Sequence, residues 1–291
     1  MTRATHYIQL TKPTIVILVV VTALAALAAE GFLFASPLQA ILIVAAIGLA
    51  AGSANAFNQY LDRDIDSVMD RTRVKRPLPL GQISPLGAFV FASLLGALST
   101  AYLWIFWNLL AALVSASTIL FYTLVYTLIL KRRHYYNIVI GGAAGAAGPI
   151  IAWAAVEGQI SGYAWLMFAL IFMWTPAHFW ALALAIKDDY SKVSVPMLPC
   201  VLGENRTRWE IIAYTISLLP LTLLPYWAGW VSLWFLLPNL AFWIWYMRAT
   251  LRACVKEKSK QAYMRLFYIS ILYLFLFFIA VAIDGAVRFF V

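Results

Sequence analysis

The feature that most constrains this chain is a series of long apolar runs separated by short charged segments. A helix that crosses the hydrocarbon core of a bilayer needs about 20 consecutive, mostly apolar residues. The chain has 291 residues, of which 64% are hydrophobic and only 11% charged. Because soluble domains carry about 25% charged residues, the sequence predicts an integral membrane protein.

Nine apolar runs are long enough to span a bilayer, and they predict an all-α, polytopic membrane protein with nine transmembrane helices in one domain, residues 1–291. The least certain division is the one between the seventh and eighth runs, where Gly229 and three prolines interrupt the apolar pattern. The predicted spans are 14–34, 37–57, 84–105, 109–130, 138–157, 163–186, 210–230, 231–251 and 265–287.

Nearly all the positive charge falls into segments on one side of this arrangement. All but one of the 21 Lys and Arg residues lie before the first span or in and beside the loops after spans two, four, six and eight, and the exception is Arg288. Cytoplasmic loops are enriched in Lys and Arg, so the pattern predicts the cell inner (plasma) membrane, a cytoplasmic N-terminus and an external C-terminus. This topology and anionic lipid head groups explain the net charge of +9, which therefore indicates no nucleic-acid partner.

The segment after the second span is rich in aspartate. If that helix continues to about residue 70, Asn58, Asp62 and Asp66 form one stripe, because each four-residue step rotates by about 40°. Asp70 then extends the stripe, whereas Asp64 points away toward solvent or arginine. Mg²⁺ is commonly held by one or two carboxylates together with substrate phosphates. The spacing is therefore compatible with a magnesium site that uses Asn58, Asp62 and Asp66 as ligands.

Four basic residues follow the aspartates directly and suit the binding of phosphate oxygens. A second interpretation is open from the spacing alone, since a charged loop that only sets membrane topology would also mix acids and bases. The basic residues are Arg71, Arg73, Lys75 and Arg76.

A second polar group lies in and after the sixth span. His178 stands inside the apolar run, where ionisable residues are functional candidates; the alternative is a hydrogen bond inside the bundle. Asp189 is eleven residues further on and shares the same helical face, so Asp189 and Lys187 are candidates for a second metal or diphosphate clamp. Neither Asp188 nor Asp189 is expected at a helix N-terminus, so capping does not explain them.

A third feature is the segment LKRRHYYNIVIGGAAGAAGP. Its basic triplet, which includes Arg132, fits either a role in topology or the binding of a phosphate or a propionate group. The glycines that follow allow close approach of neighbouring helices. These glycines are Gly141, Gly142, Gly145 and Gly148.

These motifs together resemble a known family. The stripe Asn58-x3-Asp62-x3-Asp66, followed by MDRTRVKRPLPLG, resembles the first aspartate-rich motif of the UbiA superfamily of intramembrane prenyltransferases. The segments LTKP, YTLILKRRHYYNIVIGGAAGA, WTPAHFWALALAIKDDY and VPMLP are similar to segments of the haem-farnesylating branch of that superfamily. The resemblance covers residues 8 to 209, and the last three spans match by hydropathy only.

The resemblance implies a nine-helix bundle whose cavity opens to the cytoplasm and the bilayer, with farnesyl diphosphate and haem B as substrates and Mg²⁺ as cofactor. His178 takes an early place in the second motif, where other branches carry aspartate, and this argues against a 4-hydroxybenzoate prenyltransferase. The resemblance also implies partners that use the product, such as haem A synthase or oxidase-assembly proteins.

The expected catalytic groups are Asp62, Asp66, Asp189 and His178, and the role of His178 toward haem iron, porphyrin or water is open. Asp188 and Asp189 are the candidate ligands of a second ion. The candidate groups for the diphosphate or a haem propionate are Asn58, Arg71, Arg76, Arg132 and Lys187.

Two alternative functions remain open at this stage. One is a prenyltransferase that acts on a quinone or chlorin precursor. The other is a secondary transporter, which would also have polar residues in its spans and helices broken by Gly or Pro. Transporters usually place coupling charges near the midplane of the membrane, whereas the acids of this chain gather at one face.

Overall fold

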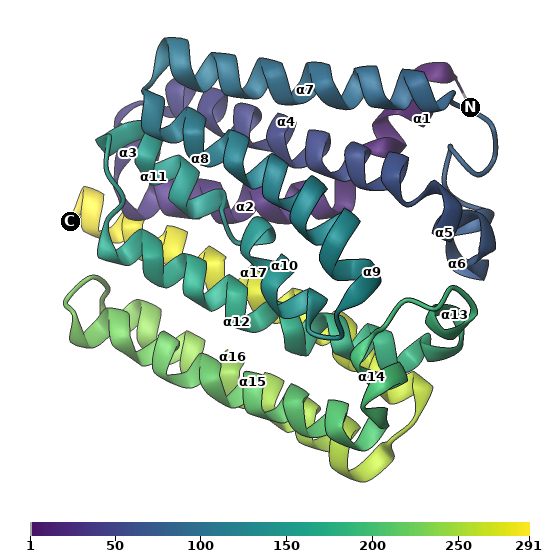
Figure 1. The fold of residues 1–291 in the computed structure, drawn as a ribbon. Coiled ribbons are helices and arrows are strands. Elements are labelled where there is room, and N and C mark those ends of the chain that lie inside the picture. Colours follow the sequence, from purple (N-terminus) through teal and green to yellow (C-terminus); the bar gives the residue numbers. More distant parts are fainter. Residues whose placement is uncertain (1) are drawn as a thin grey trace.

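The apolar runs form long helices that pack side by side, and residues 2–291, which the computed structural model describes, contain no β-strand. The first half of the chain supplies one side of the bundle, with α7 outermost and α4 packed beneath it (Figure 1). Its helices are α1 (Arg3–Leu10), α2 (Pro13–Ala29), α3 (Phe32–Ala35), α4 (Pro37–Leu61), α5 (Arg63–Val68), α6 (Asp70–Arg73), α7 (Pro85–Phe106), α8 (Leu109–Leu120), the π-helix η1 (Phe121–Leu130) and α9 (Lys131–Arg133).

The second half continues across the bundle and ends at the face formed by α15 and α16 (Figure 1). The last helix, α17, returns to the centre, where it packs against α2, α12 and α16. The helices are α10 (Asn137–Gly145), α11 (Gly148–Glu157), α12 (Gly162–Ala185), α13 (Lys187–Lys192), α14 (Leu198–Val201), α15 (Gly203–Trp227), α16 (Leu233–Leu251), the π-helix η2 (Arg252–Glu257) and α17 (Lys260–Phe290).

Seven helical segments in residues 2–291 are long and apolar enough to cross a membrane, and the pair α1 and α2, bent by 55°, adds an eighth. The predicted eighth span, 231–251, corresponds to α16, a 19-residue helix that is not among these candidate spans. The polytopic, all-helical architecture is therefore confirmed, and the count of nine spans stays a prediction.

Several helices differ from the predicted spans at their ends. The first predicted span is broken after Ala29, because Gly31 adopts a left-handed φ of 84° and starts the short helix α3. α15 begins at Gly203 and α17 at Lys260, before the predicted spans start. Hydropathy marks only the apolar part of a helix, so polar turns that extend it are missed. Pro220, Pro225 and Pro238 lie inside helices, and the chain turns instead at residues 228–232.

Helix starts in the bundle use side-chain caps, which satisfy backbone N–H groups that have no partner within the helix. Ser84, Asn108 and Ser161 each accept a hydrogen bond from the N–H three residues later. Ser259 does the same at the start of α17. These caps fix where the spans begin and hence the height of the polar loops between them.

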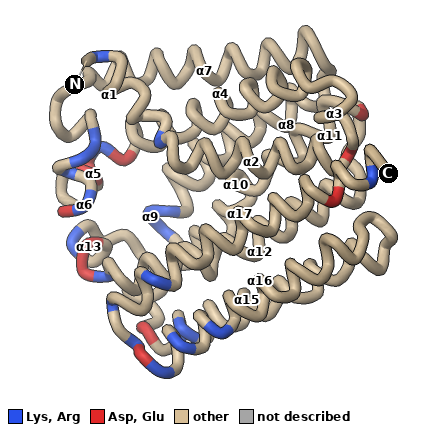
Figure 2. Tube along the Cα trace, turned by 180° about the vertical axis from the view of Figure 1, so that it is seen from behind, with Lys and Arg blue, Asp and Glu red and all other residues tan. Residues whose placement is uncertain are grey.

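The charged residues gather at one end of the bundle. Figure 2 shows most Lys and Arg around α1, α5, α6, α9 and α13 and at the turn between α16 and α17, whereas the end that holds α3 and the C-terminus has few. The asymmetry predicted from the loops is thus present in the fold. We call this charged side the basic end of the bundle.

Candidate active site

The aspartate stripe lies at the basic end, where α4 finishes. The helix does not run on to residue 70 as predicted: it ends at Leu61, α5 follows, and Met69 is extended before α6. The stripe nevertheless survives, because Asp62 N–H donates to the Asn58 carbonyl (2.9 Å) and Asp66 N–H to the Asp62 carbonyl (2.8 Å). Asn58, Asp62 and Asp66 are all almost completely buried.

Asp62 is the most enclosed carboxylate of the group. Its Oδ2 accepts from the Lys131 ammonium (2.5 Å) and from the Asn58 side-chain amide (2.7 Å). The same amide reaches the hydroxyl of Thr127 (3.2 Å), and the Asn58 Oδ1 accepts from Lys12 Nζ (2.6 Å). Asn58 therefore links Lys12 to Asp62 and orients the carboxylate.

Asp66 forms a second buried ion pair. Arg76 donates to its Oδ2, and both side chains are largely shielded from water. Burial raises the pKa of the Asp66 carboxyl, and the Arg76 guanidinium opposes this shift. Thr72 donates its hydroxyl to the Asp66 carbonyl (3.0 Å), which holds the turn after α5 in place. Two carboxylates thus each face one cation inside the protein.

Two neighbouring aspartates have other partners. Asp64 faces solvent and forms a two-pronged ion pair with Arg132 (both N···O distances 2.7 Å), and this hydrogen bonding lowers the pKa of Asp64 to about 2. The prediction that Asp64 serves an arginine contact is confirmed. The predicted extension of the stripe to Asp70 is wrong, because the break at Met69 turns Asp70 outward to Arg73 and Lys192.

The second acidic segment contacts the first through Asp189. Its carboxylate accepts from the backbone N–H groups of Asp70 (3.3 Å) and Arg71 (3.2 Å) at the start of α6. The expectation that neither Asp188 nor Asp189 lies at a helix N-terminus is wrong, because both are in the first turn of α13. Asp189 also satisfies the exposed N–H groups of α6, a helix that is distant in sequence and begins after the break at Met69. Ile65, Met69 and Tyr190 pack in one buried cluster beneath this contact.

The other candidates of this segment lie outside the buried cluster. Asp188 is exposed and makes no hydrogen bond or ion pair within residues 2–291, and Lys187 pairs with Glu204 (3.3 Å). The Arg71 side chain is exposed. The structure therefore brings together Asn58, Asp62, Asp66 and Arg76, with Asp189 at their edge. It places the side chains of Asp188, Lys187 and Arg71 elsewhere. Arg132 lies beside the group, where it donates to the Leu61 carbonyl (3.0 Å) and pairs with Asp64.

His178 lies on α12 between two aromatic rings. Its imidazole stacks on Trp174 (centroids 4.2 Å apart) and on Phe267 (4.5 Å). Its Nδ1 contacts the Ser270 hydroxyl (2.7 Å), which donates its own hydrogen to the Phe267 carbonyl (2.6 Å). Assigning the Ser270 hydrogen to the Phe267 carbonyl makes Nδ1 the donor in the His178–Ser270 bond and Nε2 the acceptor.

Sequence reasoning missed one cation of the site, Lys12, and singled out Arg132 in a basic triplet of which Lys131 makes the contact. Lys12 follows α1 in a left-handed conformation (φ 52°), which aims its side chain at Asn58. Lys131 is the first residue of the basic triplet, and it, rather than Arg132, reaches the aspartates. The sequence offers only weak local signals for them. Lys12 stands directly before the proline that opens the first long apolar run, and Lys131 is the basic residue closest to the end of the fourth apolar run.

The donor set of this site fits a hard cation. The Asp62 Oδ1 is buried and has no hydrogen-bond partner within residues 2–291, so one carboxylate oxygen remains for a ligand. Among those residues no three His, Cys, Asp or Glu side chains converge on one point. A magnesium ion that also binds substrate phosphates needs only one or two carboxylates, which is what Asp62 and Asp66 provide.

Buried carboxylates and cations at one end of a helical membrane bundle are what an enzyme acting on a lipid diphosphate requires. The sequence profile of the UbiA prenyltransferase family matches residues 18–272, and the chain belongs to that family. Within it, the chain is 46% identical to the protoheme IX farnesyltransferase of Gloeobacter violaceus, over 96% of this chain and 91% of the relative. It is 44% identical to that of Alkalilimnicola ehrlichii, with the same coverage.

Solved structures share the same fold. A digeranylgeranylglyceryl phosphate synthase superimposes with a TM-score of 0.79 at 18% identity, over 98% of this chain and 99% of that protein. An apo UbiA homologue from Aeropyrum pernix K1 gives 0.71 at 19% identity, over 95% and 98%. A UbiA homologue from Archaeoglobus fulgidus bound to GPP and Mg²⁺ gives 0.60 at 18% identity, over 95% and 99%. The UbiA-type bundle is thereby confirmed.

Proposed function

We propose that this chain transfers the farnesyl group of farnesyl diphosphate to a vinyl group of haem B, giving haem O and diphosphate. The bond between farnesyl C1 and oxygen breaks, and the vinyl carbon forms a new bond to C1. Water then captures the resulting cation and loses a proton. The relatives at 44–46% identity are named protoheme IX farnesyltransferases, and this supports farnesyl as the donor group and protohaem as the acceptor.

The observation that carries this proposal is the buried pair Asp62 and Asp66, in which Asp62 Oδ1 has no hydrogen-bond partner among residues 2–291. These carboxylates are the groups that would hold Mg²⁺, and the homologue from Archaeoglobus fulgidus was solved with GPP and Mg²⁺. Bound Mg²⁺ would stabilise the charge of the departing diphosphate. Asn58 positions Asp62 through its side-chain amide, so we assign it an orienting role in addition to its candidacy as a ligand.

Arg76, Lys131 and Lys12 supply positive charge around the same point. Arg76 and Lys131 are paired with Asp66 and Asp62, so both cations lie within reach of a diphosphate bound at those carboxylates. Preorganised cations stabilise charge that develops as a bond breaks, and each well-placed donor is worth about 10²-fold or more in rate. We assign to Lys131 the role that the sequence pattern gave to Arg132.

His178 is the candidate group for the haem. The network that protonates Nδ1 leaves the Nε2 lone pair as the atom that would bind haem iron or accept a proton from the attacking water. Trp174 and Phe267 hold the ring in a stack and restrict its rotation. A second metal ion at Asp188 and Asp189 stays a prediction. Both carboxylate oxygens of Asp189 already accept hydrogen bonds from the N–H groups at the start of α6.

The chain belongs to a family of membrane proteins, and we propose that it resides in the inner membrane with its basic end in the cytoplasm. The support is the gathering of Lys and Arg at that end (Figure 2). Farnesyl diphosphate and haem would then reach the site from the cytoplasmic side. Transfer of the product to haem A synthase or to an oxidase-assembly protein stays a prediction.

Paired substitutions on one segment test this function. Asp66→Asn should lower haem O formation from farnesyl diphosphate and haem B by about 10²-fold or more, because it removes a buried charge from the leaving-group site. Asp64→Asn, two residues away and exposed, is the matched control and should stay within about twofold of the unchanged protein. The product is measured by mass and absorbance after extraction of purified protein reactions. Near-normal turnover in Asp66→Asn, or a prenylated quinone in place of haem O, would reject the proposal.

A further inference from the structure

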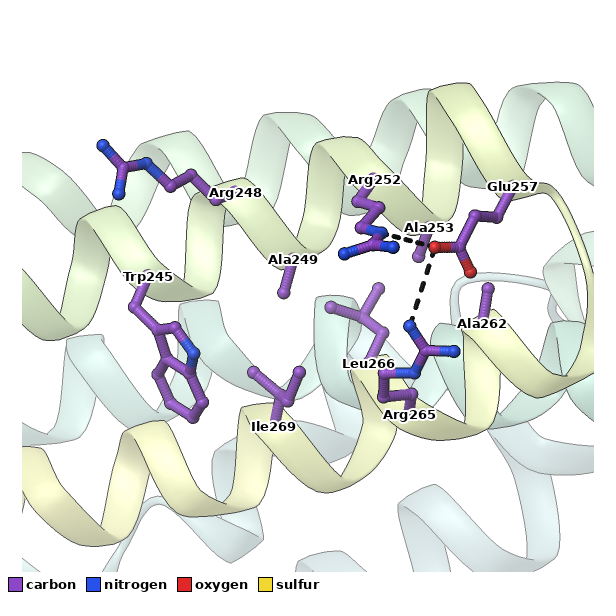
Figure 3. Close-up of a pocket in the computed structure, with 10 residues that line it drawn as sticks. All are labelled: Trp245, Arg248, Ala249, Arg252, Ala253, Glu257, Ala262, Arg265, Leu266 and Ile269. Carbon is purple, nitrogen blue, oxygen red and sulfur yellow. Dashed lines mark hydrogen bonds and ion pairs between the residues drawn. The ribbon is translucent and has the colours of Figure 1, made fainter.

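A cavity of about 220 Å³ lies between α16, η2 and α17 at the basic end of the bundle. Its floor is apolar and is formed by alanines of α16 and η2 facing larger side chains of α17. Figure 3 shows Arg252 and Arg265 reaching toward Glu257 from the two walls, with Trp245 at the far end. The lining residues that are apolar are Trp245, Ala249, Ala253, Ala262, Leu266 and Ile269.

The rim of this cavity carries more positive than negative charge. Arg248, Arg252 and Arg265 border it, and Glu257 is the only acid in the whole segment 248–265. Glu257 pairs with Arg252 (2.5 Å) and more loosely with Arg265 (3.6 Å). Arg248 makes no hydrogen bond or ion pair in the described residues, and Figure 3 shows its side chain directed away from Arg252 and Arg265. The single carboxylate of Glu257 therefore leaves the rim with a net positive charge.

The surroundings of the cavity are those of a membrane interface. Leu251, Tyr268 and Leu272 are exposed on the same two helices, as expected of side chains that contact lipid. Lys256, Lys258 and Lys260 lie at the turn and are also exposed. A basic rim above an apolar groove matches an amphiphile with an anionic head and a hydrocarbon tail.

The cavity is separate from the candidate active site. It is built by α16, η2 and α17, whereas the aspartate stripe and its cations come from α4, α5, α9, the loop after α6 and the turn before α2. No residue that lines it was assigned to diphosphate, metal or haem. The proposed prenyl transfer therefore does not account for three arginines around an apolar groove.

We propose that this cavity binds one anionic phospholipid. The phosphodiester head group lies at Arg252 and Arg265, nearest the turn, and an acyl chain runs along Ala249 and Ile269 toward Trp245 (Figure 3). Basic pockets between transmembrane helices suit such head groups, and each Lys or Arg near an anionic membrane surface contributes about 1 kcal/mol, or roughly fivefold in affinity. A zwitterionic lipid gains little from this rim because its head group carries no net charge.

The test compares lipid binding by the full purified chain in native mass spectrometry, with phosphatidylglycerol and phosphatidylcholine of identical acyl chains. The unchanged protein should retain phosphatidylglycerol preferentially. The double variant Arg252→Gln, Arg265→Gln should lose about fivefold in phosphatidylglycerol affinity for each arginine, with phosphatidylcholine binding unchanged. Arg3→Gln, Arg206→Gln removes the same charge at the same end and should stay within about twofold. Equal loss in both double variants would overturn the proposal.

A second variant guards against a folding defect, because it should strengthen binding. Glu257→Gln frees Arg252 and Arg265 and should raise phosphatidylglycerol affinity by about fivefold. Unchanged or weaker binding in this variant would overturn the proposal. Displacement of the lipid by micromolar inorganic diphosphate would do so as well, since the pocket would then serve a soluble anion.

Discussion

Four aspartates within nine residues have four different environments in this protein. Asp62 and Asp66 are buried against Lys131 and Arg76, whereas Asp64 and Asp70 pair with other cations at the surface. A buried carboxylate that loses its cation is left uncompensated, at a cost of about 3–5 kcal/mol, while an exposed ion pair contributes about 0–1 kcal/mol. Burial rather than proximity in sequence therefore decides which of these acids the chemistry can use.

The adjacent residues Lys131 and Arg132 allow a direct test of which cation acts on the diphosphate. Lys131→Gln should lower turnover by about 10²-fold, because it removes a buried charge beside Asp62. Arg132→Gln should change turnover by less than about twofold, because the half-buried Arg132 binds Asp64 and the Leu61 carbonyl and does not contact Asp62 or Asp66. Initial rates of haem O formation, together with melting temperatures in the same detergent, separate catalysis from stability. Equal effects of the two substitutions would contradict the assignment of Lys131.

The residues that sequence could and could not reveal differ in how far apart they lie along the chain. The stripe Asn58, Asp62 and Asp66 was predictable, because helical spacing is a local property. Lys12 and Lys131 were not, since they meet the stripe across 46 and 69 residues and only packing brings them there. Asp189 was identified as important, but its contact with the N–H groups of α6 depends on a chain break that periodicity does not show.

At the scale of elements, α6 is held by a residue of another segment. Asp189→Asn weakens two hydrogen bonds to the start of α6, so amide hydrogen exchange of residues 69–76 should become faster by about tenfold, or roughly 1.4 kcal/mol. Asp188→Asn, exposed and without a partner in the described residues, is the matched control and should leave exchange unchanged. Hydrogen–deuterium exchange mass spectrometry in detergent or nanodiscs measures both. Unaltered exchange in Asp189→Asn would show that the carboxylate does not hold this segment.

The glycines of α10 allow a second test of helix packing. A Cβ added at Gly141 would lie 2.2 Å from the Tyr126 ring of η1, whereas one added at Gly145 would meet nothing within 4 Å. Gly141→Ala should therefore lower stability by about 1–3 kcal/mol, as overpacking does. Gly145→Ala should be neutral or slightly stabilising, since alanine favours helix. Thermal unfolding followed by tryptophan fluorescence gives the comparison, and a tolerated Gly141→Ala would show that η1 can shift.

The same glycines show how far sequence determines elements. The small residues predicted close packing, and the structure agrees for Gly141, Gly142 and Gly148 but not for Gly145. Hydropathy located each long helix but not the polar turns that begin α15 and α17, nor the break at Gly31. The apolar pattern reports contact with lipid, while helix ends depend on caps and on residues that lie outside the hydrocarbon.

At the scale of the whole molecule, the uneven distribution of charge connects topology with function. The basic end holds the aspartate stripe, its cations and the phospholipid cavity, and the opposite end holds the C-terminus (Figure 1, Figure 2). Both proposals place their ligands, farnesyl diphosphate and an anionic lipid, at the basic end. The proposed reaction therefore needs this end to face the cytoplasm, where farnesyl diphosphate is supplied. The orientation is therefore a condition of the proposed chemistry as well as a rule of membrane insertion.

Reporter fusions test this orientation and the number of spans together. With an odd number of spans the two ends of the chain lie on opposite sides, so alkaline phosphatase fused after Val291 should be active and green fluorescent protein at the same place should be dark. Fusions in the loop after α9, which carries Lys131 to Arg133, should give the reverse pattern, because that loop lies at the basic end. If the fluorescent protein is bright both at the C-terminus and after α9, both sites are cytoplasmic and the number of spans is even. In that case α16, or the bent pair α1 and α2, does not cross the membrane. A fluorescent C-terminal fusion with an active phosphatase after α9 would invert the bundle and expose the aspartate site outside the cell, away from the cytoplasmic supply of farnesyl diphosphate that the proposed reaction needs.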